Sequence, residues 1–237
     1  METKTEHFYN HFNQDRPTGF GNWLVEKISK KIFGYAELKP GFEVLEIGPG
    51  RGIFADICLQ QQIIYTAIEA NKEMTDVLKK KGIEVIHAVV PPLPQINKNF
   101  DCAVMIHVIE HVDTMQNAMQ TARQINEVLK PGGKLIICSP DNLNLRHNFF
   151  NCDFSHNYVT TFRRLEQLLI SAGFANIKGR YLCGPITGIM CLVISALAAR
   201  LPFGLLNSWL PKNKLFQKLY KLQLTFSRNI LIVGEKC

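Results

Sequence analysis

The chain has 237 residues, 46% of them hydrophobic, and a formal net charge of +7. This length and composition suit one well-packed domain, and no internal repeat or low-complexity tract points to a repeat protein. The seven cysteines are scattered and form no C-x-x-C pair, which argues against a disulfide framework or a zinc site and favours reduced thiols in a cytosol. No apolar segment opens the chain, so we predict no secretory signal and a cytoplasmic location.

The first 35 residues are predicted to lie ahead of the core. Apolar residues recur at helical spacing from Gly21 to Tyr35, which predicts a helix over that range. Residues 1–17 are polar and are predicted to form an arm. The aromatic and basic side chains that this arm could fold over a site are Phe8, Tyr9, Phe12 and Arg16.

A glycine-rich turn follows the first predicted strand. The apolar run Phe42–Ile47 indicates a short buried strand, and residues 48–52 have the sequence Gly-Pro-Gly-Arg-Gly. A helix is predicted from Ile53 to Leu59, which gives the strand–turn–helix pattern that opens a doubly wound sheet. Glycines let the backbone turn sharply and let a ligand approach it. The helix offers that ligand unpaired N–H groups and the positive end of its dipole.

An acid beside this turn indicates the type of ligand. Glu46 lies two residues before Gly48, and glycines at 48, 50 and 52 do not fit the G-x-G-x-x-G pattern that binds a pyrophosphate. A carboxylate at this place favours a ligand with a cationic ammonium or sulfonium group. The sequence V-L-E-I-G-P-G-R-G of residues 44–52 resembles the first motif of class I S-adenosylmethionine-dependent methyltransferases.

That resemblance implies a fold, a cofactor and a set of binding residues. The fold is α/β, a Rossmann-like doubly wound sheet of seven strands, six parallel and one antiparallel, with helices on both faces. The cofactor is S-adenosylmethionine. Its predicted contacts are Glu46, Gly48, Gly50, Gly52, Glu69, Ala70, Val89 and Ile106.

The second predicted strand, Ile63–Glu69, ends in an acid 23 positions beyond Glu46. An acid at the tip of this strand, about 20 residues past the glycine turn, accepts hydrogen bonds from ribose hydroxyls. The alternative is a solvated glutamate that caps the next helix, which is predicted over Asn71–Lys81.

The third predicted strand, Ile83–Val90, runs into Pro91-Pro92-Leu93-Pro94, a rigid loop because proline fixes φ. In the methyltransferases that the chain resembles, an acid precedes this Leu-Pro and holds the adenine amine. Val89 stands at that position here. The adenine is therefore expected to be held by backbone groups and apolar contacts.

The fourth predicted strand, Phe100–Ile106, leads into a segment that resembles the E-H-V motif of the same family. The ubiquinone-pathway O-methyltransferases are the most similar group, and some of them bind magnesium through E-x-x-E-H. Here His107 takes the place of the first Glu, ahead of Glu110 and His111. Magnesium prefers oxygen ligands, so no metal site is predicted.

Methyl transfer to an oxygen requires a base that removes the acceptor's proton. His156 lies in a polar loop, residues 140–159, and is the first candidate for the base or for an acceptor contact. His107 directly follows the fourth strand and is the second candidate, as a residue that lines the pocket. His111 is more consistent with a histidine packed at a helix start.

The remaining core elements are predicted further along the chain. Asp113 is expected to cap a helix that ends at Leu129, and residues 130–133 are expected to form a turn. The whole chain, 1–237, is predicted to be a single domain with its core in 36–182 and 228–237 and a helical insertion at 183–227. The other predicted elements are strands over 134–139 and 174–181, a helix over 160–172, and a last, antiparallel strand over 229–234 beside the sixth.

The insertion has an unusual charge pattern. No Asp or Glu occurs from Gln167 to Gly234, and Leu182–Ala199 carries no charge at all. That run is long enough for a transmembrane helix, but Gly184, Pro185 and Gly188 interrupt it, and a spanning helix would separate the last strand from its sheet. We therefore predict that it does not span. Between Gln167 and Gly234 the chain has eight basic residues: Lys178, Arg180, Arg200, Lys212, Lys214, Lys218, Lys221 and Arg228.

The second half of the insertion, Lys214–Phe226, has an amphipathic pattern. Apolar residues at 215, 219, 222 and 226 form one helical stripe, with lysines beside it. A basic amphipathic helix of this kind is typical of an anionic membrane interface. The alternatives are a cap over the substrate pocket and the surface of a homodimer. Nucleic-acid binding is not predicted, because exposed aromatics suited to stacking are lacking.

The functional prediction is an S-adenosylmethionine-dependent methyltransferase of the cytoplasm or the inner face of a membrane. Its acceptor is expected to be a small amphiphilic or lipid-linked molecule, methylated on oxygen in preference to nitrogen or carbon. The alternative is a non-catalytic membrane-peripheral protein that keeps the fold, although such a protein is expected to lose Glu46 or Glu69. A nicotinamide-dependent oxidoreductase is not predicted, because the G-x-G-x-x-G turn that it would need is lacking.

Overall fold

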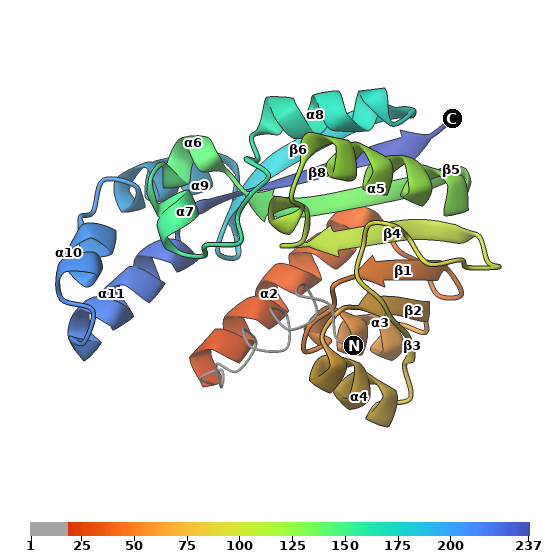
Figure 1. Cartoon of the computed structure of the whole chain (residues 1–237), viewed down its shortest axis with the longest axis horizontal. Helices are drawn as coiled ribbons and strands as arrows, with labels where there is room; N and C mark the ends of the chain where they lie inside the picture. The colour runs from red at the N-terminus through yellow and green to blue at the C-terminus, as the bar shows by residue number, and fades with distance from the viewer. Residues whose placement is uncertain (1–18) are drawn as a thin grey trace.

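The computed structural model describes residues 19–237, which contain one sheet in the strand order β3-β2-β1-β4-β5-β8-β6-β7 (Figure 1). The predicted N-terminal arm, with Phe8, Tyr9, Phe12 and Arg16, lies outside the described residues. The strands are β1 (Glu43–Ile47), β2 (Ile64–Glu69), β3 (Glu84–His87), β4 (Phe100–Ile106), β5 (Leu129–Pro140), β6 (Phe174–Cys183), β7 (Ile186–Thr187) and β8 (Arg228–Lys236).

Helices precede, connect and follow these strands. The predicted helix ahead of the first strand is present as α2 (Gly19–Ala36). The other helices are α3 (Ile53–Gln60), α4 (Lys72–Lys80), the 3₁₀ turn η1 (Ile109–His111), α5 (Met115–Val128), α6 (Asn142–Leu145), α7 (Asn148–Asn151), α8 (Phe162–Ser171), α9 (Gly188–Ala198), α10 (Phe203–Trp209) and α11 (Lys214–Thr225).

The sheet confirms the predicted fold class and corrects its strand count. Strands β3, β2, β1, β4 and β5 are parallel, and β8 runs antiparallel between β5 and β6, as expected for the last strand. An eighth strand, β7, pairs with Leu182 and Cys183 at the edge. The prediction of seven strands was wrong because β7 has only two residues and forms by folding back on β6, which leaves no periodic pattern in the sequence.

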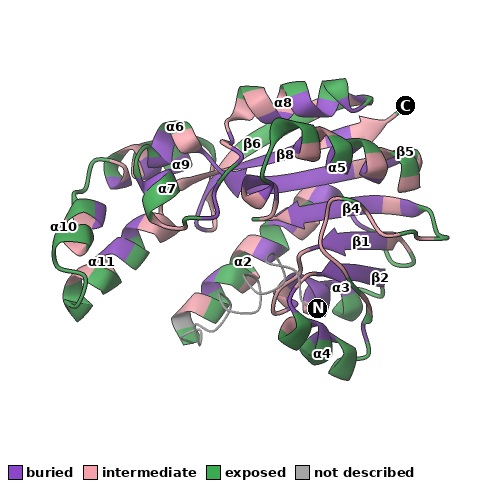
Figure 2. Ribbon diagram, in the orientation of Figure 1, coloured by how far each residue is buried: buried purple, intermediate pink, exposed green. Residues whose placement is uncertain are grey.

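The central strands are buried on both faces, which explains their continuous apolar sequences. Side chains alternate along a strand, so Leu45 joins the core cluster that packs with α5 and α8, and Val44 joins the cluster that packs with α2 and α3. Figure 2 shows this pattern, with buried strands between helices whose outer faces are exposed.

Several boundaries differ from the sequence prediction: the third strand, predicted to reach Val90, ends at His87, and two further differences lie at the two ends of α5. The side chain of Thr114, not Asp113, caps α5 by accepting from the Asn117 N–H at 3.1 Å. Residues 130–133 belong to β5, which begins at Leu129 and shifts register opposite Phe100 and Cys102. A Cβ on Gly133 would meet the Lys130 carbonyl at 2.8 Å, so the strand bends at this glycine pair without ending.

The carboxyl ends of the parallel strands meet at one edge of the sheet. There β1, β2 and β4 end near the glycine turn, while β5 and β6 lead into α6–α7 and α9–α11 at the left of Figure 1. The insertion returns to the sheet through β8, which starts at this same edge because it is antiparallel. Ligands of doubly wound folds bind at this edge, so the fold brings the insertion to the functional side.

Candidate active site

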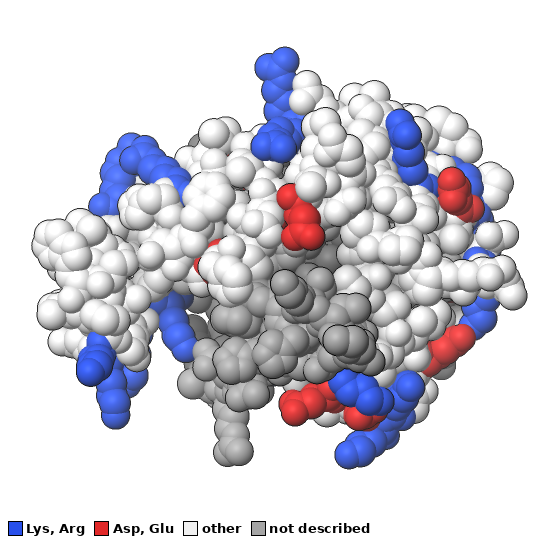
Figure 3. All heavy atoms as spheres, viewed as in Figure 1, with Lys and Arg blue, Asp and Glu red and all other residues white. Residues whose placement is uncertain are grey.

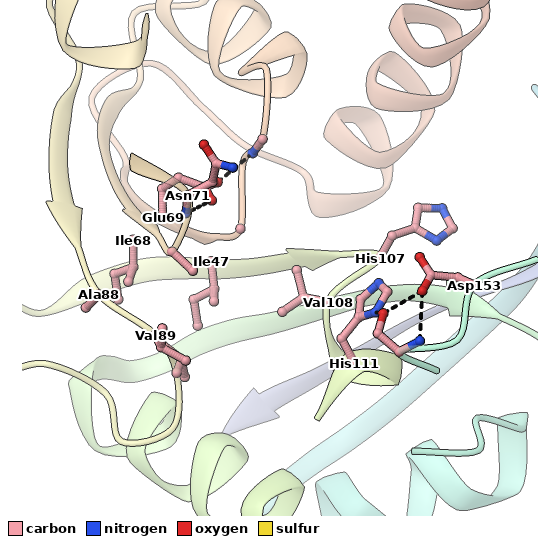
Figure 4. Close-up of a pocket in the computed structure, with 15 residues that line it drawn as sticks. Ile47, Ile68, Glu69, Asn71, Ala88, Val89, His107, Val108, His111 and Asp153 are labelled. Atoms are coloured by element: carbon pink, nitrogen blue, oxygen red, sulfur yellow. Dashed lines mark hydrogen bonds between the residues drawn. The ribbon is translucent and has the colours of Figure 1, made fainter. Parts of the chain in front are cut away.

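A cavity of about 290 Å³ opens at the carboxyl edge of the sheet (Figure 4). Its wall combines the residues that follow β1, β2, β3 and β4 with two residues from the loop before α8. The residues that line it are Ile47, Gly48, Gly50, Ile68, Glu69, Ala70, Asn71, Ala88, Val89, Val90, His107, Val108, His111, Asp153 and Ser155.

The glycine turn lets the chain form this wall without side chains. Gly48 has φ +67°, and a Cβ there would lie 2.6 Å from Val108. Gly50 has φ +54°, and a Cβ there would meet no atom within 4 Å, so the protein leaves the space beside Gly50 to the cavity. This is an arrangement in which a ligand can lie directly against the backbone.

Glu69 lies at the end of β2 and connects it to the glycine turn. Its carboxylate accepts hydrogen bonds from the N–H groups of Gly50 at 2.9 Å and Asn71 at 2.8 Å. Burial raises the pKa of Glu69, and these backbone hydrogen bonds oppose the rise. Each carboxylate oxygen has a second lone pair, so both remain able to accept from ligand hydroxyls.

An apolar slot adjoins Glu69. It is formed by Ile68, Ala88 and Val89, which lie together in Figure 4 at some distance from the histidines. Val89 therefore lines the cavity, and the family resemblance predicts that the adenine lies beside it. Such a slot suits a flat aromatic ring through apolar contact, and it offers the ring no acidic side chain.

Three residues predicted to bind the cofactor do not line the cavity in the described part of the chain: Glu46, Gly52 and Ile106. Glu46 is buried, and its carboxyl accepts a hydrogen bond from the Tyr65 hydroxyl. Burial raises the pKa of Glu46 to about 8, so it holds a proton at neutral pH.

Gly52 and Ile106 pack against other parts of the protein. Gly52 precedes α3 with φ +73°, and a Cβ there would lie 2.5 Å from the Leu78 side chain, so its absence allows the turn to pack on α4. Ile106 packs against the core cluster on the α3 side of the sheet. For all three, a cofactor contact stays a prediction.

The other end of the cavity is polar and carries a chain of three hydrogen-bonded residues. Ser155 Oγ donates to Asp153 Oδ1 at 2.6 Å, and His111 Nδ1 lies 2.7 Å from the same Oγ (Figure 4). Since the hydroxyl has one proton and gives it to Asp153, it accepts from His111. This network assigns the proton of neutral His111 to Nδ1 and leaves Nε2 as the basic nitrogen.

The charges of this chain suit a proton acceptor. Burial lowers the pKa of His111 below its ordinary value, against the raising effect of nearby Glu110. Burial opposes ionisation of Asp153, but hydrogen bonds from Ser155 outweigh it and lower the pKa of that carboxyl. At neutral pH the ring is therefore neutral and its supporting carboxylate is charged.

His107 lies beside this chain in a strained conformation. Its φ of +55° is rare for a residue with a side chain. Its Nδ1 lies 3.1 Å from buried Glu110, which also accepts from Ser139 Oγ at 3.0 Å. Burial acts to raise the pKa of Glu110, but the hydrogen bond and charge of His107 outweigh it and lower that pKa.

His156, the first candidate for the base, lies behind the cavity wall. It is buried, its Nδ1 bonds the Phe149 carbonyl at 2.6 Å, and its ring packs 5.0 Å from the ring of His111. Among the described residues the histidines that line the cavity are His107 and His111. The sequence ranked these residues differently because it does not show which side of the 140–159 loop faces the cavity.

Ligand atoms of Glu110, His111 and His156 all lie within 4.8 Å of one another, a spacing that a metal ion could bridge. Hydrogen bonds already occupy Glu110, His111 Nδ1 and His156 Nδ1. The absence of a metal stays a prediction.

Sequence reasoning missed Asp153, Ser155 and Asn71 as cavity residues. Asn71 directly follows Glu69, and its side chain caps α4, so the strand end was a usable signal. Asp153 and Ser155 had no such signal, because they reach His111 across 40 residues or more of chain.

The fold and the cavity define a class I S-adenosylmethionine-dependent methyltransferase. The sequence profile of the methyltransferase domain family matches residues 9–178, and the chain therefore belongs to that family. An uncharacterized protein of Methanocaldococcus jannaschii, MJ1123, is 36% identical over 145 residues, which cover 56% of this chain and 65% of that protein.

Other curated relatives match only a part of their length. A probable tRNA methyltransferase 9B of Bos taurus is 29% identical over 43% of this chain and 22% of that protein. Ribosomal RNA small subunit methyltransferase A of Malacoplasma penetrans is 39% identical over 32% of this chain and 28% of that protein. The chain thus spans less than a third of either relative.

Solved structures match the fold along the whole chain. A SAM-dependent methyltransferase of Archaeoglobus fulgidus has a TM-score of 0.64 at 20% identity, over 99% of this chain and 100% of that one. Phosphoethanolamine N-methyltransferase 2 of Haemonchus contortus, in complex with S-adenosyl-L-methionine, has a TM-score of 0.67 at 16% identity, over 99% and 60%.

The cavity fits S-adenosylmethionine as the cofactor. Gly50 leaves room against the backbone, Glu69 keeps acceptor capacity for ribose hydroxyls, and the slot around Val89 suits the adenine ring. Ile47 and Val108 lie between these groups and the histidines in Figure 4, so the two ends of the cavity differ in chemistry.

Proposed function

We propose that the protein transfers a methyl group from S-adenosylmethionine to a hydroxyl oxygen of a small amphiphilic acceptor. The observation that carries this proposal is the chain Asp153–Ser155–His111, which reaches the same cavity as Gly50 and Glu69. It supplies a proton acceptor beside the predicted cofactor site.

A hydroxyl needs such a group more than an amine does. S-adenosylmethionine supplies an activated methyl group on a sulfonium. A neutral amine already offers a free lone pair, whereas a hydroxyl is a weak nucleophile until a base takes its proton. His111 accepts that proton at Nε2, and Asp153, acting through Ser155, holds the ring in the tautomer that leaves Nε2 free.

His107 supplies a second polar contact to the methyl acceptor, beside His111. Its side chain is about half exposed and lines the cavity, while Glu110 fixes its Nδ1. The ring can therefore donate or accept at Nε2 toward an acceptor in the cavity. Glu110 acts on the acceptor only through His107, which makes it a positioning residue.

The surroundings favour an amphiphilic acceptor. The middle of the cavity is apolar at Ile47 and Val108, and the apolar insertion leaves the sheet at the same edge. RNA is the acceptor class in the names of several relatives, which match 32% to 54% of this chain. An RNA acceptor is therefore tested beside the lipid one.

The experiment is transfer of a labelled methyl group from S-adenosylmethionine to a bacterial lipid extract or to total RNA. We expect label in the organic phase, on a product with the chemical stability of an O-methyl group. His111→Asn should reduce the rate about 10²–10⁴-fold, the usual contribution of a positioned base. His147→Asn, at an exposed histidine outside the cavity wall, is the matched control.

Label in RNA, or on a nitrogen of the lipid product, would overturn the proposed acceptor. An unchanged rate in His111→Asn would overturn its role as the base. Binding of S-adenosylmethionine by each variant shows whether the fold is intact.

A further inference from the structure

Helix α9 is apolar on every side, and the side that it buries is not the one that a core helix would bury. Its buried residues are the small ones, Cys191, Ser195 and Ala198, while large aliphatic side chains face outward. Ile189 is 76% exposed and Leu197 is 63% exposed. In an ordinary surface helix the large apolar side chains face the core.

The predicted stripe on α11 is only partly covered by the protein, since Leu219 and Phe226 are half-buried. Leu215 and Leu222 are exposed, and the buried side chains of this helix are Tyr220 and Gln223. A cap that buries the stripe on the substrate pocket would require Leu215 and Leu222 to be covered. That alternative is therefore not supported.

Polar side chains hold the insertion together from inside. Gln223 Nε2 donates to the carbonyls of Ala198 at 2.9 Å and Leu201 at 2.7 Å, and its Oε1 accepts from the Gly204 N–H at 3.2 Å. These bonds fix the turn between α9 and α10. Gln223 thus satisfies polar groups on the inward side of the insertion, whereas Asn207 Oδ1 on α10 is buried without a hydrogen-bond partner among the described residues. The outward side is apolar.

Asparagines of α6 and α7 attach the insertion to the core. Asn144 donates to the Ser195 carbonyl at 3.1 Å, and Asn151 donates to the Tyr220 hydroxyl at 3.2 Å. The apolar face is therefore presented in a defined orientation. Its exposed large side chains are Ile189, Met190, Leu192, Val193, Leu197, Leu201, Leu205, Trp209, Leu210, Leu215 and Leu222.

The charge of this face has one sign. No acid occurs from Gln167 to Gly234, and the left of Figure 3, where Figure 1 places α10 and α11, carries blue and white atoms without red. The basic residues of the insertion are all exposed: Arg200, Lys212, Lys214, Lys218 and Lys221. Apolar side chains between cations fit an anionic, apolar surface.

We propose that α9, α10 and α11 dock on the surface of an anionic lipid bilayer, with the exposed aliphatic side chains and Trp209 entering the interface. Charge complementarity selects this partner. A second copy of the chain would bring two acid-free basic faces together, whereas anionic headgroups attract each Lys and Arg of the face.

The insertion lies in the interface and does not cross it. By length and composition the stretch Gly188–Trp209 is apolar enough to span, with a mean hydropathy of 2.1 and 22% of it buried. The structure divides it into α9, of 11 residues and about 16 Å in length, and the shorter α10. Neither helix alone reaches across a hydrocarbon core of about 30 Å.

Docking in this way has a geometrical result. The insertion leaves and rejoins the sheet at the edge that holds the cavity, through β6 and β8. The bilayer therefore lies on the side of the active site, and an amphiphilic acceptor can reach the cavity without fully leaving the membrane.

Flotation of the full-length protein with vesicles tests this inference without knowledge of the acceptor. We expect recovery with phosphatidylglycerol-containing vesicles and little with pure phosphatidylcholine. Ile189→Asp with Leu197→Asp should abolish flotation, and Ile170→Asp should not, since Ile170 is a 59% exposed apolar residue on α8, outside the insertion. Lys214→Gln with Lys218→Gln should weaken binding about 30-fold, or about fivefold for each charge, and Lys79→Gln with Lys80→Gln on α4 should not.

Other occupants of the face would give different results. Equal flotation with both vesicles, or none, would overturn the inference. So would a dimer in sedimentation that the same aspartate variants dissociate, or retention on vesicles after alkaline carbonate, which marks a spanning helix. Binding of S-adenosylmethionine by every variant shows that each is folded, so failure here is independent of the methyl acceptor.

Discussion

The cofactor half of the molecule and the insertion use polar side chains in opposite ways. Around β1 and β2, polar groups such as Glu69 point into a cavity and keep unused hydrogen-bonding capacity. In the insertion, Gln223 and Tyr220 turn inward and are satisfied, and the apolar side chains face out. The first arrangement leaves hydrogen-bonding groups available to a small polar ligand, and the second leaves apolar side chains available to an apolar surface.

The largest expected effect on stability lies where β8 connects the insertion to the sheet. Arg228 pairs with fully buried Asp141 at 2.7 Å as β8 begins. Arg228→Met leaves that carboxylate buried without its partner and should lower the free energy of unfolding by about 3–5 kcal/mol in urea denaturation. Adding Asp141→Asn should recover much of the loss. Lys134→Met removes a pair with exposed Glu37 and should change little; an equal loss in both would mean that burial does not matter here.

A smaller loss is expected inside the insertion. Gln223→Leu removes three hydrogen bonds, leaves the buried Gly204 N–H without its partner and should cost about 1–3 kcal/mol. The Ala198 carbonyl still accepts from the Leu201 N–H, and the Leu201 carbonyl is only partly buried. Gln217→Leu is the control on the same helix, since Gln217 is exposed and water can replace its bond to Pro211. If both substitutions cost the same, the inward polar contacts do not organise the insertion.

In the cofactor half, Glu69→Ala should weaken binding of S-adenosylmethionine and S-adenosylhomocysteine tenfold or more, about 1.4 kcal/mol. The substitution removes the acceptor for ribose hydroxyls and one anchor of the Gly50 backbone. Calorimetry measures it, with Glu73→Ala on the exposed side of α4 as the control. Equal affinities for all three proteins would contradict the ribose contact.

The smallest effect is a pH shift where the two halves meet. The negative charge of Asp153 favours the protonated form of His111 and raises its pKa, although burial lowers the pKa overall. Asp153→Asn should therefore move the acidic limb of the kcat/KM profile to lower pH, by up to about one unit, besides lowering the rate. Asp113→Asn, at an exposed aspartate, should leave the limb in place. Movement to higher pH would contradict the proposed chain.

The cofactor half was largely predictable from sequence because its geometry is local. A strand, a glycine turn and an acid at the next strand end place Gly48, Gly50 and Glu69 together in any doubly wound sheet. For Glu46 the predicted cofactor contact stays a prediction. Its spacing from the turn resembles the family motif, but alternation along β1 directs its side chain to buried Tyr65.

The other half depends on contacts between distant segments. His111 and His156 are both plausible bases in the sequence, and only the fold of the 140–159 loop places one in the cavity wall and the other behind it. Likewise, helical spacing identified an apolar stripe on α11, but it could not show that Gln223 would bond carbonyls 22 and 25 residues away and leave Leu215 and Leu222 exposed.

The position of β8 has a consequence for the order of assembly. This strand fills the gap between β5 and β6, yet the ribosome makes it after α9, α10 and α11. The nascent chain therefore exposes the apolar insertion while two strand edges still lack a partner, and unpaired edges invite aggregation. If the insertion docks on lipid as proposed, an early encounter with a bilayer would shield those helices before the sheet closes.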